Sequence, residues 1–529
     1  MFRILLVSIS LSCVFVGRSA AQNTSLMQQQ KLHRVYRALE RMYVDEVEMN
    51  PLVEAAIRSM LEELDPHSVY LDADEMKEAQ ESFAGEFSGI GVEFNVLKDT
   101  VIVVNTVAGG PAERAGVLPN DRIVRIDTTN AVGFSRSDVP KHLRGATGSK
   151  VAIDVVRRGR SEPLRFVLVR DRIPLNTVDA AYEAAEGIGY VKVNRFGRTT
   201  MDEFRDAMRR LGPVEGLILD LRGNGGGLLE QAVEMAEYFL PSGARIVSTE
   251  GRAVPPALFS ADRDGEFMRG NLVVLIDENS ASASEIVAGA VQDWDRGVIV
   301  GRTSFGKGLV QRQMGLGDGS AVRITIARYH TPSGRVIQRP YEKGGKEAYY
   351  EAHRARYAAA ADSVGKDAPL YRTLRSGRKV YGGGGIRPDV RIEADTARYP
   401  EYFLELYRRG IVNEFVLSYM DAERGRLERA YPGFAEFERG FEVADDVLER
   451  LVVLGRERGA ASDGAGFDAS WMPVRRHLKA LVAQRLFGTE AFYRAMHRTD
   501  DPAFARAMAL LGDWEREGAP LLRPADADE

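Results

Sequence analysis

The feature that most constrains this chain is a regular alternation of apolar strands with helices between residues 187 and 330. The expected strands and helices are, in chain order, 188–193, 200–211, 216–221, 228–240, 271–277, 284–294 and 297–301. Because the strands are apolar throughout and helices separate them, the pattern predicts a largely parallel sheet that is buried on both faces. Sheets of this type place functional sites at the carboxyl ends of their strands.

Length and composition exclude some classes of protein. A chain of 529 residues is expected to form several domains, and 44% hydrophobic residues are enough to fill more than one core. The formal net charge is −5 and 8% of the residues are aromatic. Neither value is typical of a nucleic-acid-binding protein, so we expect no nucleic acid partner.

The start of the chain predicts a secretory signal peptide at residues 1–21. Arg3 provides a positive charge, residues 4–17 are mostly apolar, and the small residues 19–21 suit a cleavage site. The apolar run is short for a membrane span, although an uncleaved anchor remains an alternative. Cys13 is the only cysteine, so the remainder of the chain can form no disulfide; a lipid attachment at Cys13 is a weaker alternative.

The remaining sequence indicates a multidomain protein of α/β and α character. Residues 22–84 have helical spacing, and residues 85–172 predict a mixed β domain with two helices. The strand–helix core extends over residues 173–395 and includes a charged, aromatic insertion at about 341–380, expected at the surface. Residues 396–529 predict a second helical region.

One predicted face of the first helical region is apolar. Leu32, Val35, Tyr36, Leu39 and Tyr43 recur at helical spacing. We favour a helix packed as a support against the rest of the chain. The alternative is a surface for dimerisation or docking.

Residues 279–285, NSASASE, form a turn between an apolar strand and a helix. Small residues permit a tight turn, and the free N–H groups at a helix start can face a developing oxyanion. Ser280, Ser282 and Ser284 are all candidate nucleophiles on local chemistry alone. The same residues also suit helix capping and close packing.

Lys307 is the candidate base, because no histidine occupies a comparable loop. It lies between two glycines after the strand ending at residue 301, and burial can lower the pKa of a lysine until it accepts a proton. The alternative is a solvated loop lysine. Residues 301–307, GRTSFGK, superficially match a phosphate loop, but Gly308 stands where Ser or Thr is required, which excludes nucleotide binding.

A second glycine loop, DLRGNGGG at residues 220–227, also connects a strand to a helix. Its backbone N–H groups could bind an anion. A flexible turn is the alternative interpretation.

Taken together, these segments resemble the C-terminal processing peptidases, or tail-specific proteases, of serine peptidase family S41. Eight segments occur in the family's order. They are DPHS at 65–68, FSGIG at 87–91, PAERAGV at 111–117, DLRGN at 220–224, SASASE at 280–285, FGKGLVQ at 305–311, TPSGR at 331–335 and GGIRPDV at 384–390.

The resemblance implies specific roles in catalysis. It makes Ser282 the nucleophile, Lys307 the base and Gln311 the residue that orients the lysine. Glu285 matches an acidic position whose role, structural or catalytic, stays open.

The resemblance also implies two donors to the oxyanion. They are the N–H of Ala283 and one N–H of the glycine loop, for which we select Gly226. Gly225 stands where many members have proline, so this loop departs from the family pattern.

Residues 85–172 resemble a PDZ domain, which binds the C-terminal carboxylate of a peptide in a backbone nest and adds the peptide as a strand. The carboxylate loop would comprise Ser88, Gly89, Ile90 and Gly91. Apolar Ile90 and Val92 favour an apolar terminal residue.

The expected protein is therefore an exported serine endopeptidase of the periplasm or cell envelope of a bacterium. Its partners would be proteins or peptides with free C-termini, and it would need no cofactor and no metal. The helical ends are candidates for contacts with a second copy or an adaptor, and association with a membrane surface stays open. The alternatives are a PDZ scaffold or chaperone on an inactive core, and a different acyl-transfer enzyme.

Overall fold

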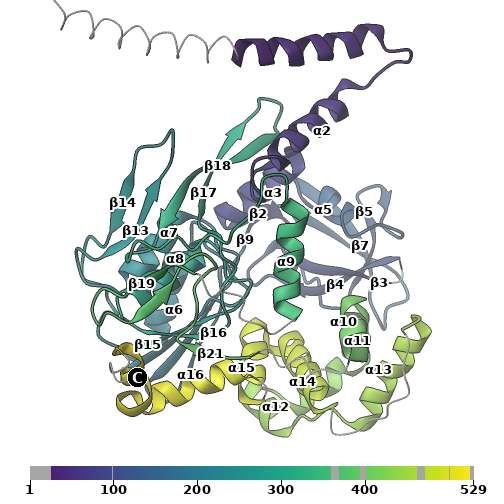
Figure 1. The fold of residues 1–529 in the computed structure, drawn as a ribbon. Coiled ribbons are helices and arrows are strands. Elements are labelled where there is room, and N and C mark those ends of the chain that lie inside the picture. Colours follow the sequence, from purple (N-terminus) through teal and green to yellow (C-terminus); the bar gives the residue numbers. More distant parts are fainter. Residues whose placement is uncertain are drawn as a thin grey trace, which may run out of the picture.

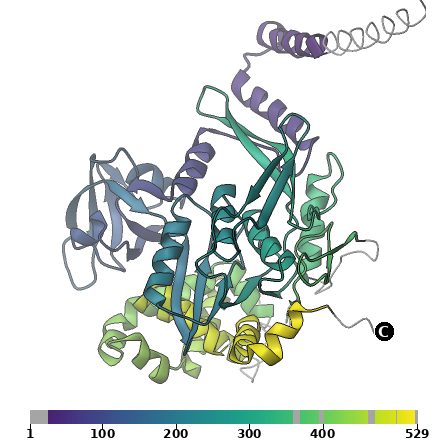
Figure 2. The same ribbon diagram turned by 90° about the vertical axis from the view of Figure 1, so that its left-hand side faces the viewer.

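The computed structural model describes residues 25–97, 99–358, 368–393, 401–460, 471–499 and 501–524. The segment predicted as a signal peptide, residues 1–21, lies outside these ranges. A peptidase-like core and a smaller β domain stand side by side above a layer of C-terminal helices, and the N-terminal helices project from the opposite end (Figures 1 and 2).

A six-stranded sheet forms the centre of the core. Its strands from β11 to β21 run parallel, and β10 is antiparallel to β11, so the prediction of a largely parallel sheet is confirmed. In spatial order the strands are β10 (Val178–Ala185), β11 (Ile188–Val193), β12 (Gly216–Asp220), β15 (Asn271–Ile276), β16 (Val298–Gly301) and β21 (Val390–Arg391).

Alternate residues of these strands enter two different cores. Leu217, Leu219 and Val274 pack with α6 (Thr200–Leu211), α7 (Leu229–Glu237) and α8 (Ala283–Asp293). Ile218 and Val273 pack on the other face. The cover there is α16 (Pro502–Gly512), which contributes Ala503, Phe504, Ala507, Leu510 and Leu511. The C-terminal region therefore completes the core of the six-stranded sheet, because a parallel sheet needs both faces covered.

A second, antiparallel sheet adjoins the first. It carries Gln311 on one strand and begins directly after the DPHS segment. Its members are β1 (Val69–Leu71), β18 (Ala321–His330), β13 (Arg245–Glu250) and β14 (Ala257–Ser260), with β17 (Leu309–Gly315) paired to β18.

The smaller domain has the expected mixed β fold with two helices, α4 (Pro111–Arg114) and α5 (Asp138–Leu143). A two-stranded ribbon of β2 (Glu86–Gly89) and β9 (Asp171–Pro174) joins it to the rest of the chain. Its sheet has β3 as an edge strand. The strands in order are β3 (Val92–Leu97), β4 (Thr100–Thr106), β5 (Arg122–Ile126), β7 (Lys150–Val156) and β8 (Leu164–Val169), with β6 (Thr129–Asn130) beside β5.

The N-terminal helical region comprises a helix that the structure describes from residue 25 to 42, α2 (Met49–Glu62) and α3 (Ala73–Ala84). Leu32 and Tyr43 are each 58% exposed, and Val35 is 54% exposed. The interpretation of this face as a packed support is therefore wrong for the single chain. The apolar side chains instead line an open groove between the first helix and α2.

The insertion contains α9 (Lys346–Ala358), β19 (Leu370–Arg372) and β20 (Lys379–Tyr381). It was expected at the surface, but Tyr349 of α9 is 5% exposed and its ring lies 5.3 Å from the ring of His67. Its aromatic residues therefore pack inward, against the loop that precedes β1.

The C-terminal helices form a domain around their own apolar core. They are α10 (Glu401–Arg408), α11 (Ile411–Ala430), α12 (Phe434–Gly440), α13 (Asp445–Glu457), α14 (Met472–Phe487) and α15 (Thr489–Thr499); α16 is followed by short turns at Trp514–Gly518 and Ala519–Leu522.

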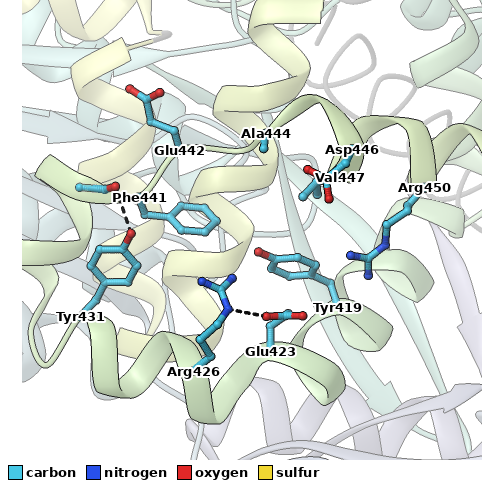
Figure 3. A pocket seen from close by; sticks show the side chains of 11 residues that line it. Tyr419, Glu423, Arg426, Tyr431, Phe441, Glu442, Ala444, Asp446, Val447 and Arg450 are labelled. Atoms are coloured by element: carbon cyan, nitrogen blue, oxygen red, sulfur yellow. Dashed lines mark hydrogen bonds and ion pairs between the residues drawn. The ribbon is translucent and has the colours of Figure 1, made fainter.

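This helical domain contacts the smaller β domain through polar groups. The Asp421 main-chain oxygen accepts a hydrogen bond from Arg158 at 2.9 Å, and the Asp421 carboxylate lies 3.6 Å from Arg122. A polar hollow opens between α11 and the start of α13, where Arg426 pairs with Glu423 (Figure 3). No helix in the described part of the chain is both long and apolar enough to cross a bilayer.

Candidate active site

Ser282 occupies a sharp turn between β15 and α8. Its backbone has φ 56° and ψ −111°, a conformation that costs a residue with a side chain on the order of 1–3 kcal/mol. A strained strand-to-helix turn of this kind projects a nucleophilic serine out of the surrounding chain. The local geometry of Ser282 is therefore that of a presented hydroxyl.

The other two serines of the turn are buried and engaged. Ser280 Oγ donates to the Leu221 carbonyl at 2.9 Å, and Ser284 Oγ donates to the Asn224 carbonyl at 2.8 Å. Ser282 is partly exposed, and its Oγ donates to no acceptor among the described residues. The structure thus separates three serines that local sequence left equivalent, and it favours Ser282.

Lys307 lies in the loop between β16 and β17 and approaches Gln311. Lys307 Nζ donates to Gln311 Oε1 at 2.9 Å, and Gln311 Nε2 donates to the carbonyl oxygen of His67. An amide has one donor end and one acceptor end, so binding its nitrogen to a carbonyl turns its oxygen toward the lysine. Burial, reinforced by the cation of Arg323, lowers the pKa of Lys307.

The DPHS segment stabilises this arrangement. Asp65 accepts hydrogen bonds from the amides of His67 and Ser68, at 2.8 and 2.9 Å, and from the Ser68 hydroxyl at 2.6 Å. The His67 carbonyl is thereby held where Gln311 reaches it. Burial lowers the pKa of the His67 ring to about 4, so the ring is neutral near pH 7. The sequence had indicated only a turn here.

Glu285 joins the serine loop to the lysine loop. Its carboxylate accepts from the amide of Ser282 at 2.8 Å, the amide of Lys307 at 2.9 Å, the amide of Gly306 at 2.7 Å and the hydroxyl of Ser304 at 2.6 Å. The side chain is fully buried, and burial raises its pKa against the effect of these donors. The sequence left its role open, and in the structure this side chain connects the two loops.

Tyr329 was not predicted from the sequence and makes a second link. Its hydroxyl, on β18, donates to the carbonyl of Lys307 at 2.6 Å and lies 3.2 Å from the carbonyl of Ser282. Within the described residues no hydrogen bond joins Ser282 Oγ to Lys307 Nζ. The two side chains are therefore brought to one site through their backbones rather than by direct contact.

The glycine loop packs against the serine turn. The Asn224 carbonyl accepts from the amide of Ala281 at 3.0 Å. The Gly226 N–H, which we expected to face an oxyanion, donates instead to Asn224 Oδ1 at 2.9 Å. The Ala283 N–H, at the start of α8, has no acceptor among the described residues, so it suits the predicted role of oxyanion donor.

The predicted carboxylate loop lies at the end of β2. Ser88 and Gly89 pair with β9, and Ser88 Oγ accepts from Thr147 Oγ1 at 3.0 Å. Ile90 is 2% exposed within the domain core, and Gly91 has φ 73°. The free edge of β3 begins directly after this loop, which is the arrangement that strand addition requires.

The described ranges hold no group of three or more His, Cys, Asp and Glu side chains that could bind a metal ion.

Comparison with known proteins gives four family matches. Peptidase family S41 matches residues 187–344, and a PDZ domain matches residues 88–166. The N-terminal domain of the activating protease CtpB matches residues 14–75, and a family of unknown function (DUF8443) matches residues 402–488.

Two bacterial relatives align with much of the chain. It is 36% identical over 342 residues to the carboxy-terminal-processing protease of Bartonella bacilliformis, covering 63% of this chain and 78% of the relative. It is 35% identical over 324 residues to the carboxy-terminal processing protease CtpB of Bacillus subtilis, covering 58% and 65%. A solved photosystem II D1 C-terminal processing protease aligns at 28% identity with a TM-score of 0.35, covering 69% of this chain and 92% of that one.

Replacing Gly226 tests the close contact between the glycine loop and the serine turn. A Cβ at Gly226 would lie 2.7 Å from the Ala281 oxygen and 2.8 Å from Ser282 Cβ, and φ is +100°. We expect Gly226→Ala to slow phosphonylation of Ser282 by a fluorophosphonate probe, in which Oγ bonds to phosphorus and fluoride leaves, by about 100-fold, because displacing the turn misplaces the hydroxyl.

The matched control is Gly225→Ala in the same loop. A Cβ there meets nothing within 4 Å, and no positive φ opposes it, so the phosphonylation rate should stay near that of the unaltered protein. Equal rates for the two variants would contradict the proposed contact.

Proposed function

Because the chain belongs to peptidase family S41 and to its carboxy-terminal processing proteases, we propose that Ser282 and Lys307 are the catalytic dyad of this PDZ-containing serine protease. The observation that carries the proposal is the buried carboxylate of Glu285, which accepts hydrogen bonds from the amides of both residues. Ser282 and Lys307, which are 25 positions apart in the sequence, are thereby placed in one site.

The proposed reaction begins with neutral Lys307. Its Nζ donates one N–H to Gln311 Oε1, which leaves the lone pair to take the proton of Ser282 Oγ. Oγ then forms a bond to the carbonyl carbon of the substrate, and the Ala283 N–H stabilises the oxyanion. Lys307 returns the proton to the leaving amine, which gives an acyl-enzyme. Lys307 next activates the water that releases the acyl group.

The role of Gly226 as an oxyanion donor requires a rearrangement of its hydrogen bond. Its N–H reaches the oxyanion only if it exchanges Asn224 Oδ1 for the substrate oxygen. Its close approach to Ser282 is independent of that exchange.

The PDZ domain supplies the specificity in this proposal. Ser88, Gly89, Ile90 and Gly91 would bind the terminal carboxylate of a substrate, and the tail would pair with the free edge of β3. Half-buried Val92 lies at the start of that strand and favours an apolar last residue. A protein with a free, apolar C-terminus would be captured there and cleaved at Ser282.

The backbone of Ser282 argues against a scaffold with an inactive core. A strained residue persists when the surrounding structure enforces it, and such residues concentrate at functional sites. A domain that only bound peptides would have no need for a strained, partly exposed serine beside a lysine of lowered pKa.

A cleavage assay tests the dyad. The substrate is an unstructured polypeptide with an apolar C-terminus, offered beside the same chain with an amidated C-terminus. We expect cleavage of the free-ended substrate, slower cleavage of the amidated one, and loss of at least about 1,000-fold in kcat for Ser282→Ala and for Lys307→Ala. EDTA should leave the rate unchanged.

The control Lys141→Ala alters an exposed lysine of the PDZ domain. Full activity of Ser282→Ala would disprove the assignment.

The pH dependence of cleavage tests the state of Lys307. The base is active when neutral, so kcat/KM should rise with pH through the pKa of Lys307 and reach a plateau. Burial and Arg323 lower that pKa below the ordinary value of 10.5. Arg323→Gln removes one of these causes, so its profile should move to higher pH. The control Arg328→Gln changes an exposed arginine on the same strand and should leave the profile in place. A shift to lower pH for Arg323→Gln would contradict the argument.

We further propose that the N-terminal helices join two copies of the chain. The groove between the first helix and α2 is lined by apolar side chains such as Leu32, Val35 and Leu52, which are 58%, 54% and 43% exposed. The first helix presents an apolar surface that matches the apolar groove. Two copies related by a twofold axis can therefore each bury the first helix of the other copy in their own groove.

Sedimentation velocity tests this assembly. We expect the unaltered protein to form dimers and the Leu32→Glu, Val35→Glu variant to be monomeric, because burial of two carboxylates in the groove is unfavourable. Val167→Glu, at a 60% exposed position of the PDZ domain, should leave the dimer intact. A monomer at every concentration of the unaltered protein would exclude the second copy and favour an adaptor.

A further inference from the structure

The carboxyl end of β12 holds a buried cluster of charged groups that comes from two distant parts of the chain. Asp220, at the end of the strand, and Arg222, at the start of the glycine loop, belong to the peptidase core. Asp501, at the N-terminus of α16, comes from the C-terminal region. The side chains of Asp220 and Asp501 are 1% and 12% exposed.

Arg222 binds both carboxylates at once. Its Nη2 lies 2.6 Å from Asp220 Oδ2 and 2.8 Å from Asp501 Oδ2. Its Nη1 donates to Asp501 Oδ1 at 2.9 Å, and its Nε donates to Asp220 at 3.1 Å. Paired hydrogen bonds of this type fix the plane of a guanidinium as well as its position.

Charge balance requires the second carboxylate. Lys192 Nζ lies 3.5 Å from Asp220 and also donates to the carbonyl of Arg222. The cluster therefore holds two cations, Lys192 and Arg222, against Asp220 and Asp501. The neighbouring His497 ring, 3.4 Å from Asp501, is neutral near pH 7, because burial lowers its pKa to about 4. Without Asp501 a buried positive charge would lack a partner, which is strongly unfavourable.

Capping of α16 does not explain the whole geometry. Asp501 Oδ1 accepts from the amide of Phe504 at 3.0 Å, which is the ordinary N-cap bond and needs one oxygen. Both carboxylate oxygens of Asp501 are also within hydrogen-bond distance of Arg222. The carboxylate therefore holds the glycine loop in addition to its own helix.

The glycine loop continues from Arg222 to the serine turn. The Gly223 amide donates to Asp277 Oδ1 at 2.9 Å. The Asn224 carbonyl accepts from the Ala281 amide at 3.0 Å and from Ser284 Oγ at 2.8 Å. A displacement of Arg222 would therefore reach the residues on both sides of Ser282.

We propose that Asp501 is a positioning residue for the active site, and that the C-terminal region is a structural part of that site rather than an accessory domain. Asp501 acts through Arg222 on residues 222–226 and touches no reacting atom. This inference rests on the proposed function, in which Ser282 is the nucleophile beside that loop.

Kinetics of Asp501→Asn test the proposal. The amide keeps the size of the side chain and one acceptor oxygen for the helix cap but removes the charge opposite Arg222. We expect kcat to fall by about 10- to 100-fold with KM changed by less than about threefold, since the PDZ domain and its tail binding are untouched. Asp501→Glu retains the charge and should recover most of kcat.

The matched control is Glu414→Gln. Glu414 is 16% exposed and pairs with Arg458 at 3.0 Å within the same C-terminal region, with no contact to the glycine loop among the described residues. We expect it to keep kcat while losing a similar amount of thermal stability. An unchanged kcat in Asp501→Asn, or an equal loss of kcat in Glu414→Gln, would overturn the proposal.

Amide hydrogen exchange separates failure of this inference from failure of the proposed function. If the unaltered protein cleaves nothing, the dyad proposal fails, but Asp501→Asn should still speed exchange at residues 222–227 by about tenfold while β15 stays protected. Unchanged exchange at 222–227 would overturn the positioning role whatever the protein cleaves. If Asp501→Asn does not fold, the comparison is made with Asp501→Glu, which should show intermediate exchange at residues 222–227. If Asp501→Glu instead exchanges like the unaltered protein and has a lower kcat, the positioning role is also overturned.

Discussion

The proposed active site depends on one buried carboxylate. Glu285 is fully enclosed and accepts hydrogen bonds from Ser282, Lys307, Gly306 and Ser304. An ionised carboxylate without such partners would be costly in this environment, and four donors without an acceptor would be costly too. The donors of both loops and the acceptor oxygens of Glu285 therefore satisfy each other's hydrogen-bonding needs. Glu285 therefore links the strained turn of Ser282 to the loop of Lys307.

Support for the two loops comes from segments far apart in the sequence. Gln311 is oriented by the His67 carbonyl, which Asp65 holds in place before the first strand. Tyr329 binds the backbone of both loops from β18. The insertion adds Tyr349, which packs beside His67. Burial of this surrounding shell is also what lowers the pKa of Lys307, so packing and chemistry have the same cause here.

The C-terminal region takes part in this architecture in two ways. Helix α16 covers the face of the parallel sheet that α6, α7 and α8 leave uncovered. Asp501, at the start of the same helix, contacts Arg222 at the start of the glycine loop. The region also touches the PDZ domain through Asp421. It is thus in contact with the sheet, the glycine loop and the module proposed to capture substrates.

Much of this protein followed from local sequence. Apolar strands alternating with helices predicted the parallel sheet, and small residues at the strand ends marked the loops that carry Ser282, Lys307 and Gly226, because both signals depend on neighbouring residues only. The family and its PDZ domain followed from short segments in a fixed order. Other features depend on residues that meet only after folding. Glu285, Tyr329 and Asp501 carry no local pattern that identifies their partners. Local sequence also did not reveal the engaged N–H of Gly226, and it could not decide between a packed and an exposed face around Leu32. Hydrogen bonds between distant loops and the covering of a sheet face are decided by three-dimensional contact, and only the tertiary structure contains that information.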